Sequence, residues 1–375
     1  MDAAPFEIFL AVAPGLEPLL RDEALARGFG PAAIVPGGVT LTGGWPEVWR
    51  ANLELRGPTR VLARIGAFRA MHLAQLDKRA RRFPWEAVLR PGTAVRVEVT
   101  CRASRIYHAG AATERIEGAL RAALGAPIDP EARVAVKVRI EDDLCQISVD
   151  TSGESLHRRG FKVAVAKAPM RETMAALFLA GCGYAGAEPV LDPMCGSGTF
   201  VIEAAEIALG LMPGRGRSFA FEDFATFDPA AWAALRARDT ARPAPEFRFR
   251  GSDRDQGAVR MSAENAARAG LSGVTAFERL PVAELARPEG PPGLVIVNPP
   301  YGARIGETGP LRGLHASLGA RLREDFGGWR VGLVTTDPTL ARATGLPFGP
   351  PGPPVAHGGL KVRLYQTGPL PASSG

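Results

Sequence analysis

Apolar and polar positions in the first 55 residues follow the periods of both strands and helices. Residues 6–15 (FEIFLAVAPG) open with a short apolar run that predicts a strand. Residues 15–29 (GLEPLLRDEALARGF) have the spacing of an amphipathic helix that ends at Gly28. Short strands follow through residues 39–43 (VTLTG). This part of the chain is therefore predicted to form a βαβ-type unit.

The next hundred residues predict a second module. Residues 94–102 (AVRVEVTCR) alternate as a strand does, and residues 112–124 (ATERIEGALRAAL) have helical spacing. Residues 133–153 alternate again, which predicts a pair of strands. Residues from about 50 to 155 thus form a predicted α+β module.

The pattern changes after a basic linker and a helix that begins near Pro169. Short apolar strands then alternate with helix-compatible sequence, which predicts an α/β domain with a mostly parallel sheet. The stretch from Leu211 to Glu246 is long for a connection and is predicted to be a partly helical insertion. The expected strands lie at residues 189–195, 247–253, 274–279, 293–300, 329–336 and 358–368; of the first five, all but the third are followed by a helix.

Charge is unevenly distributed along the chain of 375 residues. The net charge is +6, but residues 50–139 hold 18 Lys and Arg against 8 Asp and Glu, an excess of +10, which leaves −4 elsewhere. Residues 76–89 (LDKRARRFPWEAVL) mix cations with Phe83 and Trp85, a combination that suits phosphate contacts and base stacking. A polyanion-binding module is one interpretation of the excess, and a solvated arginine-rich face is the other.

Other features favour a cytoplasmic protein without a metal site. No apolar run approaches the roughly 20 residues of a membrane span, and the N-terminal run carries Glu7 and lacks a basic leader. The four cysteines form no CxxC pair, so we expect neither zinc nor a disulfide framework.

A glycine loop follows the first strand of the α/β domain, in residues 190–205 (VLDPMCGSGTFVIEAA). Glycine lets the backbone approach a ligand closely, and doubly wound folds bind nucleotides at this position. The loop is not a P-loop, because no Lys follows the glycines, and it lacks a full GxGxxG. An acid just before the loop would repel a pyrophosphate but suits a cationic ligand such as S-adenosylmethionine. The next strand ends at Asp253, where Rossmann-type folds place an acid that accepts ribose hydroxyls.

These observations predict a set of cofactor-binding residues. A tight βα turn alone would explain the loop, but not its combination with Asp253 and the motif described next. The candidates are Asp192, Pro193, Met194, Cys195, Gly196, Ser197, Gly198, Thr199, Asp253 and Asn298. Cys195 lies in this loop and is not expected to act as a nucleophile.

The fourth strand of the α/β domain ends abruptly in Asn298-Pro299-Pro300-Tyr301. This sequence resembles the catalytic motif of enzymes that methylate an exocyclic amine of adenine, cytosine or guanine, or a glutamine amide. The Asn298 side-chain oxygen and the Pro299 carbonyl can accept the two hydrogens of such an amine and orient its lone pair. Pro300 helps to fix the backbone, and Tyr301 offers a ring for stacking. These four are the predicted catalytic residues; the alternative is a strand that ends in a Pro-rich turn.

Together the motifs resemble the THUMP-domain RNA methyltransferases, particularly the bacterial guanine-N2 branch related to the N-terminal half of the large-subunit rRNA methyltransferase. The matching segments extend over nearly the whole chain: GLEPLLRDE, SRIYHAG, SLHRRGFK, APMRETMAA, LDPMCGSGTFVIEAA, RSFAFEDF and NPPYGARIG. One departure is visible, because residues 277–282 offer no Asp after the third strand, where many relatives have an acid that meets the adenine amino group.

The resemblance implies a domain order and a fold. Residues 1–55 would be a ferredoxin-like region, 56–155 a THUMP RNA-binding domain, 156–188 a linker with a leading helix, and 189–375 a Rossmann-like methyltransferase domain. The methyltransferase sheet would have seven mostly parallel strands in the order 3-2-1-4-5-7-6. The RNA-binding residues would be Lys78, Arg79, Arg81, Arg82, Arg105, Arg158, Arg159 and Lys162.

The expected activity is S-adenosylmethionine-dependent methylation of guanine N2 in RNA by a cytoplasmic monomer. Ribosomal RNA of the large subunit is the favoured partner and tRNA is the alternative, since the family modifies both. Protein-glutamine methylation is a rival, against which the basic N-terminal half argues. A non-catalytic RNA-binding protein would not need Asp192, Asp253 and Asn298 together.

Overall fold

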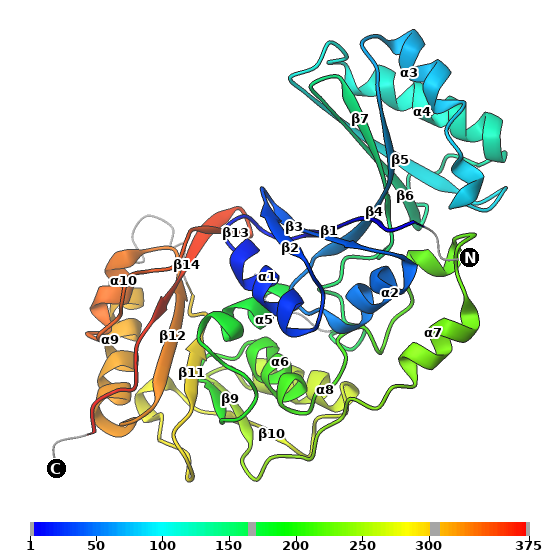
Figure 1. The fold of residues 1–375 in the computed structure, drawn as a ribbon. Helices are drawn as coiled ribbons and strands as arrows, with labels where there is room; N and C mark the ends of the chain where they lie inside the picture. The colour runs from blue at the N-terminus through cyan, green and yellow to red at the C-terminus, as the bar shows by residue number, and fades with distance from the viewer. Residues whose placement is uncertain (1–3, 164–169, 301–307, 373–375) are drawn as a thin grey trace. The chain divides into compact units, whose positions relative to one another are not determined.

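The computed structural model describes residues 4–163, 170–300 and 308–372, which form two compact units. Unit 1 comprises Met1–Val12, Leu20–Leu156 and Arg217–Arg238, and unit 2 comprises the rest of the chain. Each unit contains one seven-stranded sheet (Figure 1).

Unit 1 contains two α+β modules, one before strand β4 and one after it. Its elements in chain order are β1 Phe6–Ala11, α1 Glu17–Ala26 (whose first turn falls in unit 2), β2 Ala32–Val35, β3 Gly38–Gly43, α2 Trp45–Glu54, β4 Arg60–Arg69, α3 Leu73–Ala80, η1 Trp85–Ala87, β5 Val95–Arg102, α4 Ala109–Leu124, β6 Val134–Glu141, β7 Leu144–Asp150, η2 Ala220–Asp223 and α7 Pro229–Arg236.

The long strand β4 joins the two modules into one sheet with the order β2-β3-β1-β4-β7-β6-β5. Residues 60–64 of β4 pair with β1, and residues 62–69 pair with β7. The sequence-based boundary between residues 55 and 56 therefore lies just before a strand that belongs to both modules. Period-2 alternation puts Ile8 and Leu10 in the core and leaves Glu7 and Phe9 on the other face.

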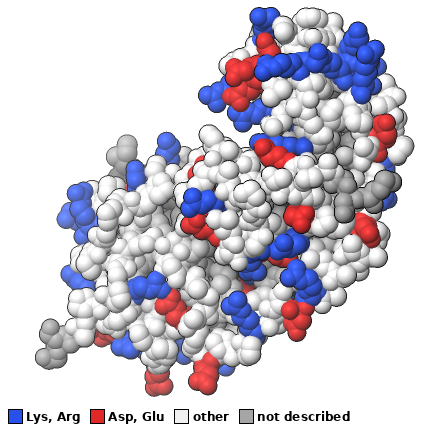
Figure 2. Space-filling model, viewed as in Figure 1, with Lys and Arg blue, Asp and Glu red and all other residues white. Residues whose placement is uncertain are grey.

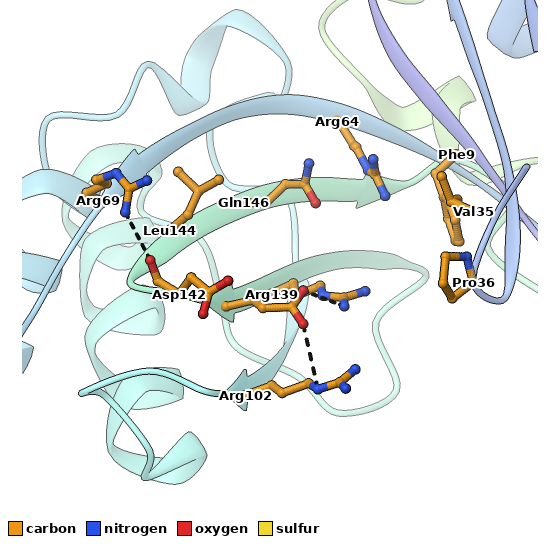
Figure 3. Close-up of a pocket in the computed structure, with 11 residues that line it drawn as sticks. Phe9, Val35, Pro36, Arg64, Arg69, Arg102, Arg139, Asp142, Leu144 and Gln146 are labelled. Atoms are coloured by element: carbon orange, nitrogen blue, oxygen red, sulfur yellow. Dashed lines mark hydrogen bonds and ion pairs between the residues drawn. The ribbon is translucent and has the colours of Figure 1, made fainter. Parts of the chain in front are cut away.

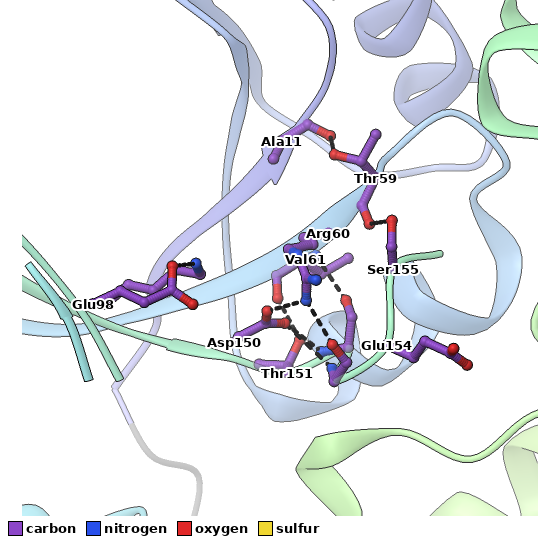
Figure 4. Close-up of polar contacts among 12 residues, drawn as sticks. Ala11, Thr59, Arg60, Val61, Glu98, Asp150, Thr151, Glu154 and Ser155 are labelled. Carbon is purple, nitrogen blue, oxygen red and sulfur yellow. Dashed lines mark hydrogen bonds and ion pairs between the residues drawn. The ribbon is translucent and has the colours of Figure 1, made fainter. Parts of the chain in front are cut away.

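A buried polar junction holds the end of β7 against β4 (Figure 4). Asp150 is fully buried, pairs with Arg60 and accepts hydrogen bonds from the N–H groups of Ser152 (3.0 Å) and Gly153 (3.3 Å). The Thr151 hydroxyl donates to the Val61 carbonyl at 2.7 Å. A buried carboxylate is stable only when it is paired and hydrogen-bonded in this way.

The predicted insertion in the second half of the chain is present, and its central part, Arg217–Arg238, belongs to unit 1. Phe221 stacks on Phe219 with ring centroids 5.2 Å apart, and Trp232 packs edge-on against Phe221 at 5.0 Å. Phe224 forms an isolated bridge with Leu89. Because these rings are buried, the insertion is part of the core of unit 1.

Unit 2 is an α/β domain. Its elements are α5 Glu172–Gly181, β8 Val190–Asp192, α6 Thr199–Ala208, β9 Phe249–Asp253, α8 Gln256–Arg268, β10 Thr275–Arg279, η3 Val282–Glu284, β11 Leu294–Val297, α9 Thr308–Asp325, β12 Arg330–Thr335, α10 Pro338–Ala343, β13 Val355–His357 and β14 Leu360–Gln366.

The sheet of unit 2 has the order β10-β9-β8-β11-β12-β14-β13. Numbered within the domain this is 3-2-1-4-5-7-6, so the expected order is confirmed, with β14 antiparallel to β12. Helices α9 and α10 lie on one side of the sheet and α5, α6 and α8 on the other (Figure 1). Leu318 and Leu322 of α9 pack on the fully buried Val295 and Val297 of β11. Within the described part of the chain, no helix is both long and apolar enough to cross a membrane.

Candidate active site

Three adjacent parallel strands of unit 2 end at the same edge of the sheet, and each carries a predicted functional side chain. Strand β8 ends at Asp192, β9 ends at Asp253, and Asn298 follows β11 directly. Asp192 is in register with Gly251, and Leu191 is in register with Val295, so the three side chains come from neighbouring strands. The carboxyl edge at a point where strand order reverses is the usual ligand site of such sheets.

The loop after β8 needs its glycines. Gly196 and Gly198 have φ of +55° and +81°, which side chains rarely allow. A Cβ on Gly198 would also lie 3.1 Å from the Ser262 side chain and 3.3 Å from the ring of Phe277. The Ser262 hydroxyl donates to the Gly196 carbonyl at 2.9 Å, and Asn265 Nδ2 donates to the Ser197 carbonyl at 3.1 Å. These two hydrogen bonds from helix α8 therefore fix the shape of the loop.

Asp192 is 3% exposed, and its environment disfavours its charged form. Burial, together with the negative charge of Asp253, raises the pKa of Asp192 to about 8, although the N–H of Met194 donates to its Oδ1 at 3.0 Å. A buried carboxyl group beside a second carboxylate suits a ligand that brings positive charge.

Asp253 is half-buried at the tip of β9 and is linked to the glycine loop. Its Oδ2 accepts a hydrogen bond from the N–H of Gly196 at 3.1 Å, and its Oδ1 accepts one from the N–H of Asp255 at 3.0 Å. The carboxylate is thus held in one orientation, which leaves its remaining lone pairs available to hydroxyl donors.

Asn298 presents a buried acceptor. Its Oδ1 is excluded from solvent, and no group among the described residues donates a hydrogen bond to it. Leaving such an atom unsatisfied costs about 1–3 kcal/mol, so its retention calls for an explanation. Pro299 is buried beside it and Pro300 is exposed. Tyr301, the fourth predicted catalytic residue, lies outside the described residues.

The residues present fit S-adenosylmethionine by their chemistry. Gly196 and Gly198 leave the loop without a side chain at two positions, and the acidic pair matches the ammonium and sulfonium of that molecule. Burial also raises the pKa of the Cys195 thiol, and Asp192 adds to this effect, which agrees with the exclusion of Cys195 as a nucleophile.

Phe277 of β10 is a residue that the sequence did not single out. A Cβ on Gly251 would lie 2.7 Å from its ring, and Gly198 also faces it, so the ring forms an apolar wall beside the loop. Residues 277–282 offer no Asp after the third strand, and the Phe277 ring supplies apolar packing beside the glycine loop.

The predicted RNA-binding residues separate into two groups. Lys78, Arg79, Arg81, Arg82 and Arg105 are exposed on unit 1, and Arg158 is exposed on unit 2. Lys and Arg side chains gather over the part of unit 1 that carries α3 and α4 (Figure 2).

The expectation that Trp85 stacks on bases is wrong. Trp85 is 0% exposed, its indole N–H donates to the Ala80 carbonyl at 2.8 Å, and its ring lies 4.6 Å from that of Phe83. Trp85 belongs to the core beside α3, and Phe83 is half-buried against it. Because the Trp85 ring is buried and its N–H is satisfied, it cannot stack on a nucleotide.

Arg159 and Lys162 also require correction. Arg159 is 2% exposed, and its Nε lies 3.1 Å from Oε1 of the buried Glu203. The Lys162 ammonium donates to Thr199 Oγ1 at 2.8 Å and lies 3.3 Å from the Glu172 carboxylate, and both charged side chains are less than 10% exposed. These two cations are used inside unit 2, where Lys162 braces the first residue of α6, and they are not available to RNA.

The seven-stranded sheet and the three strand-end groups define the class of protein as an α/β methyltransferase. Residues 159–347 match the family described as "RMKL-like, methyltransferase domain", and residues 7–62 match the "RlmL ferredoxin-like domain". The chain belongs to this RMKL-like methyltransferase family, and a ferredoxin-like domain precedes its methyltransferase fold.

A curated relative and two solved structures are similar over almost the whole chain. The "Ribosomal RNA large subunit methyltransferase K/L" of Syntrophotalea carbinolica is 35% identical over 364 residues, which are 92% of this chain and 51% of that protein. The chain thus spans about half the length of this curated relative.

The first solved structure is that of SMU.472, a protein described as a methyltransferase and complexed with SAH, with a TM-score of 0.88 and 25% identity over 99% of this chain and 100% of that one. The second is a protein described as an N6-adenine-specific DNA methylase from Listeria monocytogenes, with a TM-score of 0.87 and 28% identity over 97% of both chains. Methyltransferases of this fold use S-adenosylmethionine, as the sequence predicts.

Proposed function

We propose that this chain transfers the methyl group of S-adenosylmethionine to the exocyclic N2 of a guanosine in RNA, and that the RNA is 23S ribosomal RNA. The observation that carries the proposal is the buried, unpartnered Oδ1 of Asn298 at the edge where Asp192 and Asp253 lie. An acceptor kept without a donor is suited to a donor that arrives with the substrate.

The cofactor would be held by the loop from Asp192 to Thr199 and by Asp253. Asp192 would face its positive charge, the loop main chain would approach it closely, and Asp253 would accept its ribose hydroxyls. The complex of SMU.472 with SAH supports a cofactor of this kind for the shared fold. When bound, S-adenosylmethionine supplies an electrophilic methyl group on its sulfonium.

The protein's part in the reaction is to orient and activate a weak nucleophile. The nitrogen lone pair of an exocyclic amine is conjugated with its ring. Asn298 Oδ1 and the Pro299 carbonyl would accept its two hydrogens, turn the lone pair toward the methyl group and stabilise the positive charge that grows on nitrogen. Pro300 keeps the backbone rigid, and Tyr301 would stack on the base.

The choice of base and polymer depends on the relatives. The relative from Syntrophotalea carbinolica is named as a methyltransferase of large-subunit ribosomal RNA, and the motifs resemble the guanine-N2 branch. The Listeria monocytogenes neighbour is described as acting on adenine N6 in DNA. Acceptors such as Asn298 Oδ1 suit either amine. Guanosine in tRNA is the second candidate, and in each case we expect a cytoplasmic monomer.

The proposal is tested by product analysis. The purified chain would be incubated with labelled S-adenosylmethionine and, separately, with unmodified 23S rRNA, tRNA and DNA, and the products digested to nucleosides. We expect N2-methylguanosine from 23S rRNA alone. N6-methyladenosine would refute the base while preserving the role of Asn298, and labelling of tRNA alone would favour the second candidate. Absence of label from all three nucleic acids would refute the substrate class.

A further inference from the structure

One face of the β4–β7 part of the unit 1 sheet carries polar and basic side chains in ordered rows. Strand register aligns Arg64 with Ser148, Ser148 with Lys137, and Lys137 with Glu98. The next row contains Gln146, Arg139 and Thr100, and the third contains Arg69, Leu144, Glu141 and Arg102. The intervening residues of β6 and β7, such as Val138 and Ile147, are buried on the opposite face.

A pocket of about 570 Å³ is open on this face (Figure 3). Phe9, Val35 and Pro36 form an apolar end. Arginines from three strands line the rest, together with Glu141, Asp142, Leu144 and Gln146. We call it the β4–β7 groove, with Arg64, Arg69, Arg102 and Arg139 as its cations. Its volume lies within the range of about 300–1,000 Å³ of pockets that hold small molecules.

The groove has an excess of positive charge. Its four arginines are opposed by Glu141 and Asp142 among the lining residues, a net charge of +2. Burial lowers the pKa of Arg64, and the positive charge of Arg139 lowers it further, so these two guanidinium groups are close enough to repel. Arg64 already pairs with Glu7, and an anion placed between the two guanidinium groups would reduce the repulsion that remains.

The two ion pairs that Glu141 forms in the groove are exchangeable. Arg102 is 78% exposed and lies 3.7 Å from Glu141, and Arg139 is 51% exposed and lies 2.5 Å from the same carboxylate. Exposed pairs of this kind contribute little to stability. A phosphate that binds both guanidinium groups could replace the shared carboxylate at little cost.

We propose that the β4–β7 groove binds a single-stranded segment of the RNA substrate. This inference rests on the proposed function and adds the place where the RNA is held. Phosphates would contact Arg102, Arg139 and Arg69, and a base would lie toward the apolar end. There the Arg64 guanidinium already sits over the Phe9 ring at 4.9 Å, a platform of the kind on which RNA bases stack.

A single strand fits better than a duplex or a protein. A duplex keeps its bases stacked inside and presents a wide, regular backbone, whereas this pocket has the size for one or two unstacked nucleotides beside a cationic wall. An acidic peptide would match the charge but would not use the apolar end with its Arg64–Phe9 pair.

The experiment compares paired substitutions in the full-length chain. Arg102→Gln with Arg139→Gln removes two groove cations whose side chains are largely exposed, so folding should be preserved. Arg115→Gln with Arg121→Gln is the matched control, because both are exposed on α4, which packs against β5. Lys78→Gln with Arg82→Gln tests the basic cluster at the end of α3 (Lys78, Arg79, Arg81 and Arg82), which the sequence favoured as the RNA-binding site. The probe is a labelled single-stranded RNA 12-mer, with binding measured from 0.05 to 1 M salt.

The salt slope is the slope of the logarithm of the binding constant against the logarithm of the salt concentration. Loss of two phosphate contacts should lower its magnitude by about 1.4, which corresponds to about 25-fold weaker binding at 0.1 M salt and little change at 1 M. We expect this for the groove pair and not for the α4 control. In methylation assays the groove pair should raise KM for RNA and leave kcat unchanged.

The proposal would be overturned if the Arg102→Gln, Arg139→Gln variant bound RNA as tightly as the α4 control. It would also be overturned if the Lys78→Gln, Arg82→Gln variant lost more RNA affinity than the groove variant. If poly-glutamate of the same charge displaced the labelled RNA as well as unlabelled RNA does, the groove would be a general surface for acidic partners, and the proposal would be overturned too. Wild-type chain that neither binds nor methylates RNA would instead refute the proposed function. If the wild-type chain methylated RNA and the groove variant bound RNA as well as wild type, only the RNA-binding role of the groove would be refuted.

Discussion

Replacing Asn298 with alanine separates catalysis from stability more clearly than any other change in the site. In most buried positions the loss of an amide removes a hydrogen bond and destabilises the protein. Here Oδ1 has no donor among the described residues, so the substitution removes an unsatisfied acceptor whose burial costs about 1–3 kcal/mol. The free energy of unfolding should therefore be unchanged or slightly higher.

The effect on the reaction should be large. Of the two proposed acceptors, the Pro299 carbonyl belongs to the main chain and remains, so one preorganised group is lost. Loss of one such group commonly lowers kcat by about 10²–10³, which corresponds to about 2.7–4 kcal/mol of transition-state stabilisation. Cofactor affinity should stay within about twofold, because Asn298 accepts from the substrate amine.

Three measurements on one preparation test this. Single-turnover methylation of a 23S rRNA fragment gives the chemical rate, calorimetry gives cofactor affinity, and denaturant unfolding gives stability. Asn298→Asp is the control, since a carboxylate still offers an acceptor at this position and should retain more activity than alanine. A near-normal rate for Asn298→Ala would refute the mechanism. A slow enzyme that is also several kcal/mol less stable would show that Asn298 is structural.

The remaining predictions concern the acidic pair and the buried side chains that the sequence assigned to RNA. Because the pKa of Asp192 is raised to about 8, its carboxyl group is protonated near pH 7 and must ionise to face a cation. Cofactor binding should therefore release a proton, and cofactor affinity should increase as the pH rises to about 8. Calorimetry in buffers of different ionisation enthalpy detects the proton release, and its absence in the wild-type protein would contradict this role of Asp192. Asp253→Ala should weaken cofactor binding by roughly 1.5–3 kcal/mol, and unchanged affinity would remove the reason for its role. Trp85→Ala should cost about 3–5 kcal/mol of stability while RNA affinity of the folded protein at 1 M salt stays the same; a selective loss of that affinity would restore the stacking role. Arg159→Ala should destabilise unit 2 by about 3–5 kcal/mol, because it leaves Glu203 buried without this partner, and should not change the salt slope of RNA binding; a lower slope with normal stability would argue for an RNA contact.

Most of the fold of unit 2 could be predicted from local sequence. Short apolar runs set the strands, their alternation with helices set a parallel sheet, and the family resemblance supplied the order that the structure confirms. The site was predictable for the same reason, because residues that follow parallel strands meet at one edge. Asp192, Asp253 and Asn298 were therefore brought together by the topology, although more than a hundred residues separate the first from the last.

The limits appear where exposure depends on packing between distant segments. Lys78 and Trp85 lie in one basic and aromatic stretch, yet the first is exposed and the second is fully buried. Arg159 and Lys162 read as a basic linker, and only the approach of α5 and α6 supplies the carboxylates that hold them inside unit 2.

What the sequence alone determined is most of the elements of unit 2, the glycine loop and the acids and amide at the strand ends, because these follow from short-range pattern and backbone geometry. Strand β4, which joins the two modules of unit 1, was not predicted. The tertiary structure decided that Arg217–Arg238, an insertion from the second half of the chain, completes the core of unit 1. It also decided that Arg102 and Arg139 share a groove. The alternation of Arg96 to Arg102 and of Lys137 to Glu141 was a signal that these strands carry a basic face. Strand pairing, however, is a long-range choice, and only the register places those side chains side by side.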